Sequence, residues 1–134
     1  MTDFDWPVRV YYEDTDAGGV VYHANYLRFF ERARTEWLRQ LGYSQAQMAR
    51  EQDLLFTVVD LQVQFHAPAR LDDALRVRSQ ARLAGGASVT FNQELWRDAG
   101  TPQRLASATV RVACLQPGSL RPRRLPDALR EELS

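Results

Sequence analysis

One stretch of this chain indicates both its fold and its chemistry: Glu13-Asp14-Thr15-Asp16-Ala17-Gly18-Gly19-Val20-Val21-Tyr22-His23-Ala24-Asn25-Tyr26. It places paired acids, two glycines and a histidine directly ahead of a long amphipathic segment. The first N–H groups of a helix have no partner inside the helix and point outward. A carboxylate held beside such groups is suited to attack on a carbonyl, so we expect the functional site here.

The segment that follows is predicted to form a helix over residues 23–41. Apolar side chains recur there at helical spacing, namely Tyr26, Phe30, Ala33, Trp37 and Leu41. Gly42 is well placed as the C-terminal cap of this helix. A shorter helix is predicted to begin after Ser44 as its N-cap, with Gln47 in the capping-box position.

Most of the remaining sequence alternates with a period of two, which predicts β-strands. We expect a short strand over residues 8–13 and four more over 54–65, 75–83, 89–95 and 103–115, with turns at 67–73, 85–86 and 98–100 and a last helical turn near 127–133. Hairpin-length links indicate an antiparallel sheet. The sequence therefore predicts an α+β fold with a five-stranded antiparallel sheet around one long central helix. The open edges of such a sheet favour a dimer that extends it.

The composition is that of one globular domain spanning residues 1–134. Lys plus Arg and Asp plus Glu each number 17, and this zero net charge argues against a nucleic-acid binder. The acidic N-terminal segment lacks an apolar signal region, and no run is long and apolar enough to span a bilayer. We therefore expect a cytoplasmic protein with no integral membrane segment.

Cysteine and histidine usage excludes two further classes of site. Cys114 is the only cysteine, so no intramolecular disulfide can form, and its apolar, strand-like surroundings predict a buried structural thiol. No Cys/His cluster has the spacing of metal ligands, so we expect no metal and no other cofactor. His66, at a predicted strand end, is interpreted as a structural or interface histidine.

Three segments carry a resemblance to a known family: residues 10–26, which include the opening stretch, Phe30-Glu31-Arg32-Ala33-Arg34-Thr35-Glu36, and Ala67-Pro68-Ala69-Arg70-Leu71-Asp72-Asp73. Together they resemble the hotdog-fold thioesterases of the 4-hydroxybenzoyl-CoA thioesterase type, and within these the Tol-Pal-associated acyl-CoA thioesterases. The resemblance covers nearly the whole chain. It implies a hotdog fold, hydrolysis of an acyl-CoA to a carboxylic acid and CoA, and a homodimer or homotetramer with active sites at the dimer interface.

The resemblance assigns two catalytic positions. Asp16 corresponds to the family's catalytic aspartate, which is either a nucleophile or a base that activates water, and the sequence does not choose between these roles. The His23 backbone N–H corresponds to the contact with the thioester carbonyl, worth about 3 kcal/mol in the transition state. The His23 imidazole has two open interpretations, polarising substrate or water and lining the pocket. Asp14 is interpreted as a loop acid, solvated or hydrogen-bonded, in preference to a group that raises its neighbour's pKa.

Other residues are predicted to support or contact the substrate. Gly18 and Gly19 allow a tight backbone path that side chains would obstruct. Tyr22 and Asn25 are expected to orient the turn beside the substrate. The resemblance also implies that strand residues approach the partner's site, and for these we predict Thr57, Val58 and Val59.

Two features of the sequence allow more than one acyl donor and more than one type of reaction. The hairpin at residues 84–88 has no basic side chain, so CoA phosphates would need Arg82, Arg70, Arg76 or Arg78, and an acyl carrier protein remains an alternative acyl donor. The enzymatic rival is a hotdog dehydratase acting on acyl carrier protein through His23 and Glu36, although Glu36 is better interpreted as an ion-paired surface acid, as is Glu31. A non-catalytic acyl-binding or envelope-associated scaffold is the rival outside catalysis.

Overall fold

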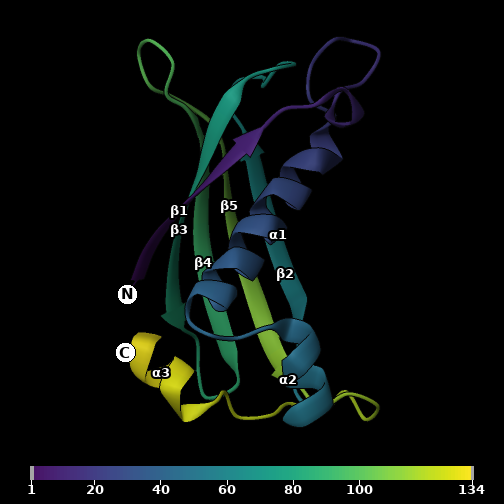
Figure 1. Cartoon of the computed structure of the whole chain (residues 1–134), viewed down its shortest axis with the longest axis vertical. Coiled ribbons are helices and arrows are strands. Elements are labelled where there is room, and N and C mark those ends of the chain that lie inside the picture. Colours follow the sequence, from purple (N-terminus) through teal and green to yellow (C-terminus); the bar gives the residue numbers. More distant parts are fainter. Residues whose placement is uncertain (1, 134) are drawn as a thin grey trace.

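A curved antiparallel sheet packs against one long helix in the computed structural model, which describes residues 2–133 (Figure 1). The elements are β1 (Thr2–Arg9), the short 3-10 turn η1 (Tyr12–Asp14), α1 (His23–Gln40), α2 (Gln45–Glu51), β2 (Leu55–Phe65), β3 (Ala74–Leu83), β4 (Ser88–Arg97), β5 (Gln103–Leu115) and α3 (Asp127–Leu133). The sheet order is β1-β3-β4-β5-β2, and every neighbouring pair is antiparallel. The predicted five-stranded sheet around one long helix is confirmed.

Helix α1 buries its apolar stripe against the sheet. Phe29, Phe30 and Trp37 belong to the same buried core as Phe91 of β4 and Val110 of β5. The Trp37 and Phe91 rings meet edge to face with centroids 5.3 Å apart, an arrangement that aromatic quadrupoles favour. The 3.6-residue period therefore predicted both the helix and the face that it buries.

A buried polar contact fixes α1 relative to the sheet. Gln93 of β4 is 1% exposed, and its Nε2 donates to the carbonyl oxygen of Phe30 at 3.0 Å and to Oγ of Ser79 at 2.9 Å. Its Oε1 accepts a hydrogen bond from Nη1 of Arg34 at 3.0 Å. Because buried amides are costly when unpaired, this set of bonds favours a single position of the helix.

Of the capping residues predicted between α1 and α2, Gly42 and Ser44 take the expected roles and Gln47 does not. Gly42 has φ 95°, a left-handed conformation that favours glycine, and Tyr43 N–H donates to the carbonyl oxygen of Leu38. Ser44 caps α2, with its Oγ 3.5 Å from the backbone N–H of Gln47. The reciprocal half of the capping box does not form, because the Gln47 side chain donates to Glu51 instead.

The bounds of the first strand were predicted wrongly. The first strand covers Thr2–Arg9 and not residues 8–13, because the Asp14 carboxylate accepts the Tyr11 N–H and turns the chain at η1. The second strand, β2, begins at Leu55, within one residue of the predicted start. Its register against β5 shifts between Val58 and Asp60, and a bulge of this kind locally interrupts the period-two pattern.

The only cysteine of the sequence, Cys114, lies near the end of β5. Cys114 is fully buried, as the sequence predicted, and burial raises the pKa of the thiol. Within residues 2–133, no helix is both long and apolar enough to cross a membrane.

Candidate functional site

The loop before α1 is a tight turn that carries Asp16 back toward the start of the helix. Asp16 N–H donates to the carbonyl oxygen of Val20 at 2.9 Å, and Gly19 N–H donates to the carbonyl oxygen of Asp16 at 3.1 Å. Thr15 and Val21 form an antiparallel bridge across the same turn. Gly19 has φ 79°, which a residue with a side chain rarely adopts. The turn therefore requires glycine at this position.

The Asp16 carboxylate is exposed and held by one backbone contact. Its Oδ1 accepts a hydrogen bond from the Gly18 N–H at 2.8 Å. A Cβ atom at Gly18 would lie 3.2 Å from that same oxygen, closer than most real contacts of this kind. Gly18 therefore lets the backbone approach the carboxylate, and Oδ2 has no hydrogen-bond partner among the described residues.

The start of α1 provides a backbone donor on the other side of the turn. Helix α1 begins at His23, and its N-cap, Tyr22, makes no side-chain capping bond. Within residues 2–133, the His23 backbone N–H has no hydrogen-bond acceptor. A free N–H at a helix N-terminus attracts an anion or a polarised carbonyl oxygen. The loop thus presents a carboxylate and an electropositive N–H to solvent, the two groups needed for acyl transfer to water.

Asp14 supports this turn from beneath. It is 3% exposed, and its two carboxylate oxygens accept hydrogen bonds from Tyr11 N–H and from Nδ2 of Asn25, both at 2.8 Å. Its carbonyl oxygen accepts the Tyr22 N–H at 2.8 Å. The interpretation of Asp14 as a hydrogen-bonded loop acid is confirmed. Asn25 is 5% exposed and joins the loop to α1, while its predicted contact with substrate stays a prediction.

Removing the Asp14 carboxylate should destabilise the protein and reduce its activity. Asp14→Ala would leave the Tyr11 N–H and the Asn25 amide without their acceptor, at a cost of roughly 2–4 kcal/mol. Urea denaturation measures this loss. Glu13→Ala, which removes an exposed neighbouring acid, should change stability far less, and equal effects of the two substitutions would contradict this role of Asp14.

A second turn holds the loop from the side. Ala69 N–H donates to Oη of Tyr26 at 3.0 Å, and the Ala69 carbonyl oxygen accepts the Val21 N–H at 2.9 Å. Asp73 closes this turn by accepting the Arg70 N–H and forms a half-buried ion pair with Arg97 at 3.0 Å. The sequence predicted a turn at residues 67–73, and the family resemblance includes the same segment, but nothing in the sequence signalled the role of Arg97.

Aromatic side chains form an apolar wall beside His23. The Tyr22 and His23 rings have centroids 4.5 Å apart, and Phe65 at the end of β2 lies 6.5 Å from His23 and 5.2 Å from Tyr26. Phe65 is 53% exposed and was not predicted as a site residue. An aromatic residue at a strand end is ordinarily interpreted as core, so no sequence pattern indicated that Phe65 lies beside His23.

The three predicted strand residues lie away from Asp16 within one protomer. Thr57, Val58 and Val59 are near the start of β2, whereas Phe65, at the opposite end of the strand, contacts His23. At about 3.3 Å per residue, Val58 and Phe65 are roughly 23 Å apart along the strand. One protomer therefore does not bring Thr57, Val58 and Val59 together with the catalytic loop.

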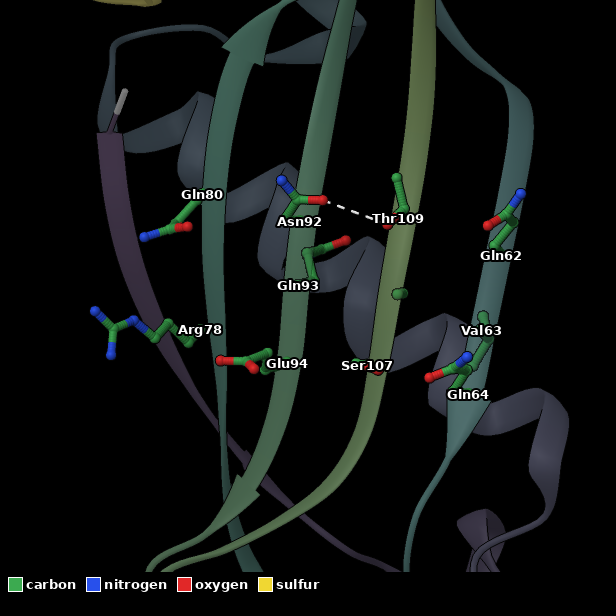
Figure 2. Close-up of a pocket in the computed structure, with 11 residues that line it drawn as sticks. Gln62, Val63, Gln64, Arg78, Gln80, Asn92, Gln93, Glu94, Ser107 and Thr109 are labelled. Atoms are coloured by element: carbon green, nitrogen blue, oxygen red, sulfur yellow. Dashed lines mark hydrogen bonds between the residues drawn. The ribbon is translucent and has the colours of Figure 1, made fainter.

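The face of the sheet that points away from α1 holds a wide polar hollow of about 790 Å³ (Figure 2). Its lining is dominated by amide and hydroxyl side chains, including Gln62, Gln64, Asn92 and Thr109. His66 lies on the exposed surface nearby, with Nε2 3.0 Å from Oγ of Ser107. Arg78, one of the arginines considered for the CoA phosphates, is the only residue considered for the site that lines this hollow.

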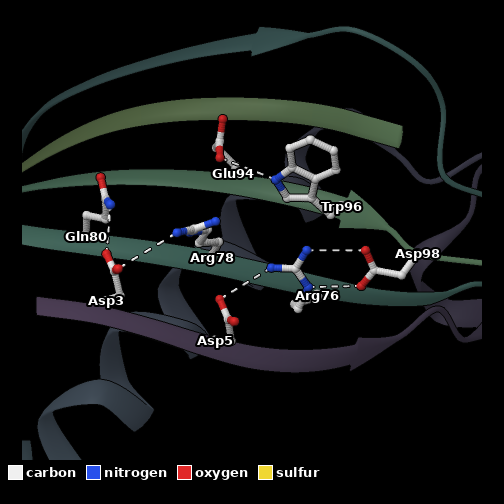
Figure 3. A network of polar contacts seen from close by, with 8 residues as sticks. All are labelled: Asp3, Asp5, Arg76, Arg78, Gln80, Glu94, Trp96 and Asp98. Atoms are coloured by element: carbon white, nitrogen blue, oxygen red, sulfur yellow. Dashed lines mark hydrogen bonds and ion pairs between the residues drawn. The ribbon is translucent and has the colours of Figure 1, made fainter. Parts of the chain in front are cut away.

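Ion pairs on the same face engage two of the arginines considered for phosphate binding (Figure 3). Arg76 bonds Asp98 at 2.9 Å and Asp5 at 3.4 Å, and the hydrogen bond to Asp98 raises the pKa of Arg76. Arg78 lies 3.7 Å from Asp3. Arg70 differs, because its backbone bridges Val20 in the catalytic loop and its side chain has no ion-pair partner in the described part of the chain.

Residues 2–133 contain no group of three or more metal-ligating side chains close enough to hold a metal ion. At the loop before α1, the groups suited to chemistry are the Asp16 carboxylate, the His23 backbone N–H and the His23 imidazole.

Sequence relatives cover nearly the whole chain. The Haemophilus influenzae protein named acyl-CoA thioesterase YbgC is 50% identical over 92% of this chain and 88% of its own length. The Escherichia coli O6:H1 protein named acyl-CoA thioester hydrolase YbgC is 47% identical over 96% of this chain and 93% of its own length.

Solved structures share the fold. A 1,4-dihydroxy-2-naphthoyl-CoA thioesterase from Synechocystis has a TM-score of 0.92 at 26% identity, covering 98% of this chain and 96% of that one. A probable thioesterase from Bartonella henselae has a TM-score of 0.86 at 36% identity, covering 93% of this chain and 100% of that one. The predicted hotdog fold and thioesterase resemblance are confirmed. Because residues 18–102 match the family described as "4HBT: Thioesterase superfamily", the chain belongs to the 4HBT thioesterase superfamily.

Proposed function

We propose that this protein hydrolyses the thioester of an acyl-CoA to a free carboxylic acid and CoA. The observation that carries the proposal is an exposed carboxylate, Asp16, in the same turn as the unbonded His23 N–H at the start of α1. The names of relatives at 50% and 47% identity support the substrate class. Thiol release from a panel of acyl-CoA substrates tests the proposal directly.

In the proposed reaction, the thioester carbonyl oxygen accepts the His23 N–H. Negative charge grows on that oxygen in the transition state, and the donor together with the α1 dipole stabilises it by about 3 kcal/mol. Asp16 either attacks the carbonyl carbon, forming an anhydride that water then hydrolyses, or removes a proton from the attacking water. In both routes the C–S bond breaks, and the CoA thiolate leaves and takes up a proton.

We infer that the working unit is at least a dimer formed through β2. This strand lies at the edge of the sheet and pairs only with β5 among the described strands. Val58, Val59, Leu61 and Phe65 of this strand are all more than a third exposed. An edge of this length with uncovered apolar side chains is suited to pairing with a second copy. Pairing of this kind would also bring Thr57, Val58 and Val59 toward the partner's loop.

Arg70 is the arginine we propose for the CoA phosphates. It is exposed beside the catalytic loop, whereas Arg76 and Arg78 already have carboxylate partners. Arg70→Gln should raise KM for acyl-CoA about tenfold with little change in kcat, because phosphate contacts are made equally in the ground and transition states.

Two controls isolate this contact. Arg50→Gln removes an exposed arginine on α2 and should leave KM unchanged. An acyl-N-acetylcysteamine thioester lacks the nucleotide, so Arg70→Gln should hydrolyse it as the wild type does. An equal loss on both substrates would assign Arg70 to the loop's structure and not to the phosphates.

The rival reactions predict different outcomes in the same assay. Hydrolysis of acyl carrier protein thioesters alone would favour the carrier-protein donor, and no hydrolysis at all would favour an acyl-binding scaffold. The dehydratase hypothesis needs His23 and Glu36 to act together, yet they lie 13 residues apart on α1, which is about 20 Å. Glu36 is also ion-paired with Arg39 at 3.3 Å.

A further inference from the structure

The turn at residues 67–73 supports the catalytic loop that precedes α1. Val21 N–H donates to the Ala69 carbonyl oxygen at 2.9 Å, and Val20 forms an antiparallel bridge with the same turn. The Val20 carbonyl oxygen accepts the Asp16 N–H, also at 2.9 Å. A displacement of the turn would therefore move Val20 and Val21 and change where the Asp16 carboxylate lies.

A β-bulge in β5 holds the start of this turn. The register between β4 and β5 shifts after Leu95, which leaves Leu105 of β5 as an extra residue. The Leu105 carbonyl oxygen accepts hydrogen bonds from the N–H groups of His66 at 2.8 Å and of Ala67 at 3.1 Å. Bulges are common beside active sites, where they redirect groups that an even ladder would pair. This bulge therefore anchors the chain where β2 leads into the turn.

Arg97, the last residue of β4, holds the rest of the turn. The alternation of the strand places it on the same face as the buried Leu95, which is the face that carries the core. Its Nη1 donates to the Pro68 carbonyl oxygen at 3.3 Å and to Oδ2 of Asp73 at 3.0 Å, so one guanidinium group joins the two ends of the turn. Its Nη2 donates to Oε1 of Gln103 at 2.6 Å, which ties the same group to β5.

Asp73 connects the ion pair with Arg97 to the backbone of the turn and of the chain beside it. Its Oδ2 also accepts the Arg70 N–H at 2.9 Å, and its carbonyl oxygen accepts the Val10 N–H at 3.0 Å. The side chains of Arg97 and Asp73 are only 25% and 22% exposed. Salt screens a partly buried pair less than a surface pair, and a planar guanidinium with several acceptors keeps a fixed geometry. The pair is therefore suited to fixing the position of the turn.

Arg97 bonds the support of the catalytic loop and not the loop itself. Within residues 2–133 its guanidinium bonds only the turn and β5. We propose that Arg97 is a positioning residue: through Asp73 it fixes the turn at residues 67–73, and the turn fixes the direction of the Asp16 carboxylate. This inference rests on the proposed hydrolase function, in which Asp16 is the reacting carboxylate. It adds a residue of β4 that acts on the reaction without touching the substrate.

Arg97→Met should lower kcat for acyl-CoA hydrolysis about tenfold with little change in KM, because a misplacement of ~1 Å at the reacting groups can cost up to about 100-fold in rate. Methionine keeps an unbranched stem but removes the guanidinium that joins the turn to β5. Arg97→Lys can keep one bond to Asp73 or to Pro68, and it should recover part of the lost kcat. A higher KM with unchanged kcat would make Arg97 a phosphate ligand and would overturn the positioning role.

Asp73→Asn tests whether Arg97 acts through Asp73. Asparagine retains an oxygen for the Arg70 N–H but removes the charge that pairs with Arg97. The double variant should lose no more kcat than the more affected single variant, because both substitutions break the same link, and losses that multiply would overturn the link. Arg104→Met is the matched control, because it breaks a 3.0 Å ion pair with Glu94 on the polar face of the sheet. It should leave kcat and KM unchanged.

Amide hydrogen exchange reports the position of the catalytic loop without any substrate. The N–H groups of Asp16 and Val21 should exchange about tenfold faster in Arg97→Met than in wild type, because their acceptors lie in the loop and the turn. The N–H of Val110, in the interior of β5, should change less. Equal acceleration at Val110 would mean that Arg97 acts through global stability and would overturn the positioning role.

The two measurements separate this inference from the function on which it rests. A wild type that is inactive on every acyl-CoA would overturn the proposed function, and the exchange experiment would still decide whether Arg97 holds the loop. Unchanged exchange of Asp16 and Val21 in Arg97→Met would overturn the positioning role, whatever the wild-type activity. If Arg97→Met does not fold, Asp73→Asn breaks the same ion pair and serves for both measurements.

Discussion

Asp16→Asn should reduce kcat/KM for acyl-CoA hydrolysis at least ~100-fold while leaving the fold intact. Asparagine has nearly the size of aspartate and keeps an oxygen that can accept the Gly18 N–H, so the turn at Gly18 and Gly19 should persist. The substitution removes only the negative charge needed by a nucleophile or a general base. Thiol release with the best acyl-CoA, together with the thermal midpoint of each protein, measures both effects.

A matched control separates the effect of losing the Asp16 charge from the effect of losing any nearby negative charge. Glu13→Gln neutralises an exposed acid three residues earlier and should keep nearly full activity. Full activity in Asp16→Asn would remove Asp16 from the reaction. Loss of activity accompanied by a large drop in thermal midpoint would instead make Asp16 a structural residue of the loop.

Pre-steady-state kinetics should then choose between the two roles of Asp16. A nucleophilic carboxylate forms an acyl-enzyme, so a rapid burst of thiol should precede steady turnover when hydrolysis of the anhydride is slower. A general base gives no covalent intermediate, and hydroxylamine would trap no acyl group from the enzyme. The exposed position of Asp16 is compatible with both roles, because either route needs only one oxygen directed at the substrate or at water.

The sequence predicted the elements whose pattern is local. Helix α1 was placed to within one residue, because its apolar residues keep a 3.6-residue period and Gly42 marks its end. The start of β2 was also placed to within one residue, although the bulge between Val58 and Asp60 breaks the alternation further along the strand. The first strand was misplaced because the bond from Tyr11 to the side chain of Asp14 outweighs the period-two pattern there.

The candidate site was predictable only where it depends on one segment. Asp16, Gly18 and His23 lie within eight residues of each other, so their motif could be found in the linear sequence. Phe65 enters the site from a distant strand, and no local pattern distinguishes it from a core residue. The separation of Val58 from Asp16 along one chain is a property of the folded sheet, and only the family resemblance, through a site shared with the partner, related the two segments.

Leu61→Arg should convert the protein to a monomer and lower kcat/KM for acyl-CoA hydrolysis at least ~100-fold. Leu61 lies near the middle of β2 on the face that carries the core, yet it is 39% exposed in one protomer. An arginine there can reach water in a monomer, so the fold should survive. In a dimer paired through β2 the same arginine would be buried in the interface in both protomers, and unpaired charges in an interface cost several kcal/mol.

The activity should fall with the dimer because the proposed site draws on both protomers. Thr57, Val58 and Val59 lie near the start of β2, while Phe65, which contacts His23, lies at the opposite end of that strand in the same chain. Separation of the protomers would remove the partner's β2 residues from each catalytic loop. Sedimentation velocity at the assay concentration reports the association state, and thiol release reports the activity.

Gln62→Arg is the matched control, because it adds the same charge to the adjacent residue of β2 but on the polar face that lines the outer hollow. It should leave both the dimer and the activity largely intact. A Leu61→Arg protein that stays dimeric would place the interface elsewhere than the β2 edge. A monomeric Leu61→Arg protein with full activity would show that one chain holds every group the reaction requires. Catalysis should depend on the β2 edge, which is far from Asp16, only if the site is shared between two chains.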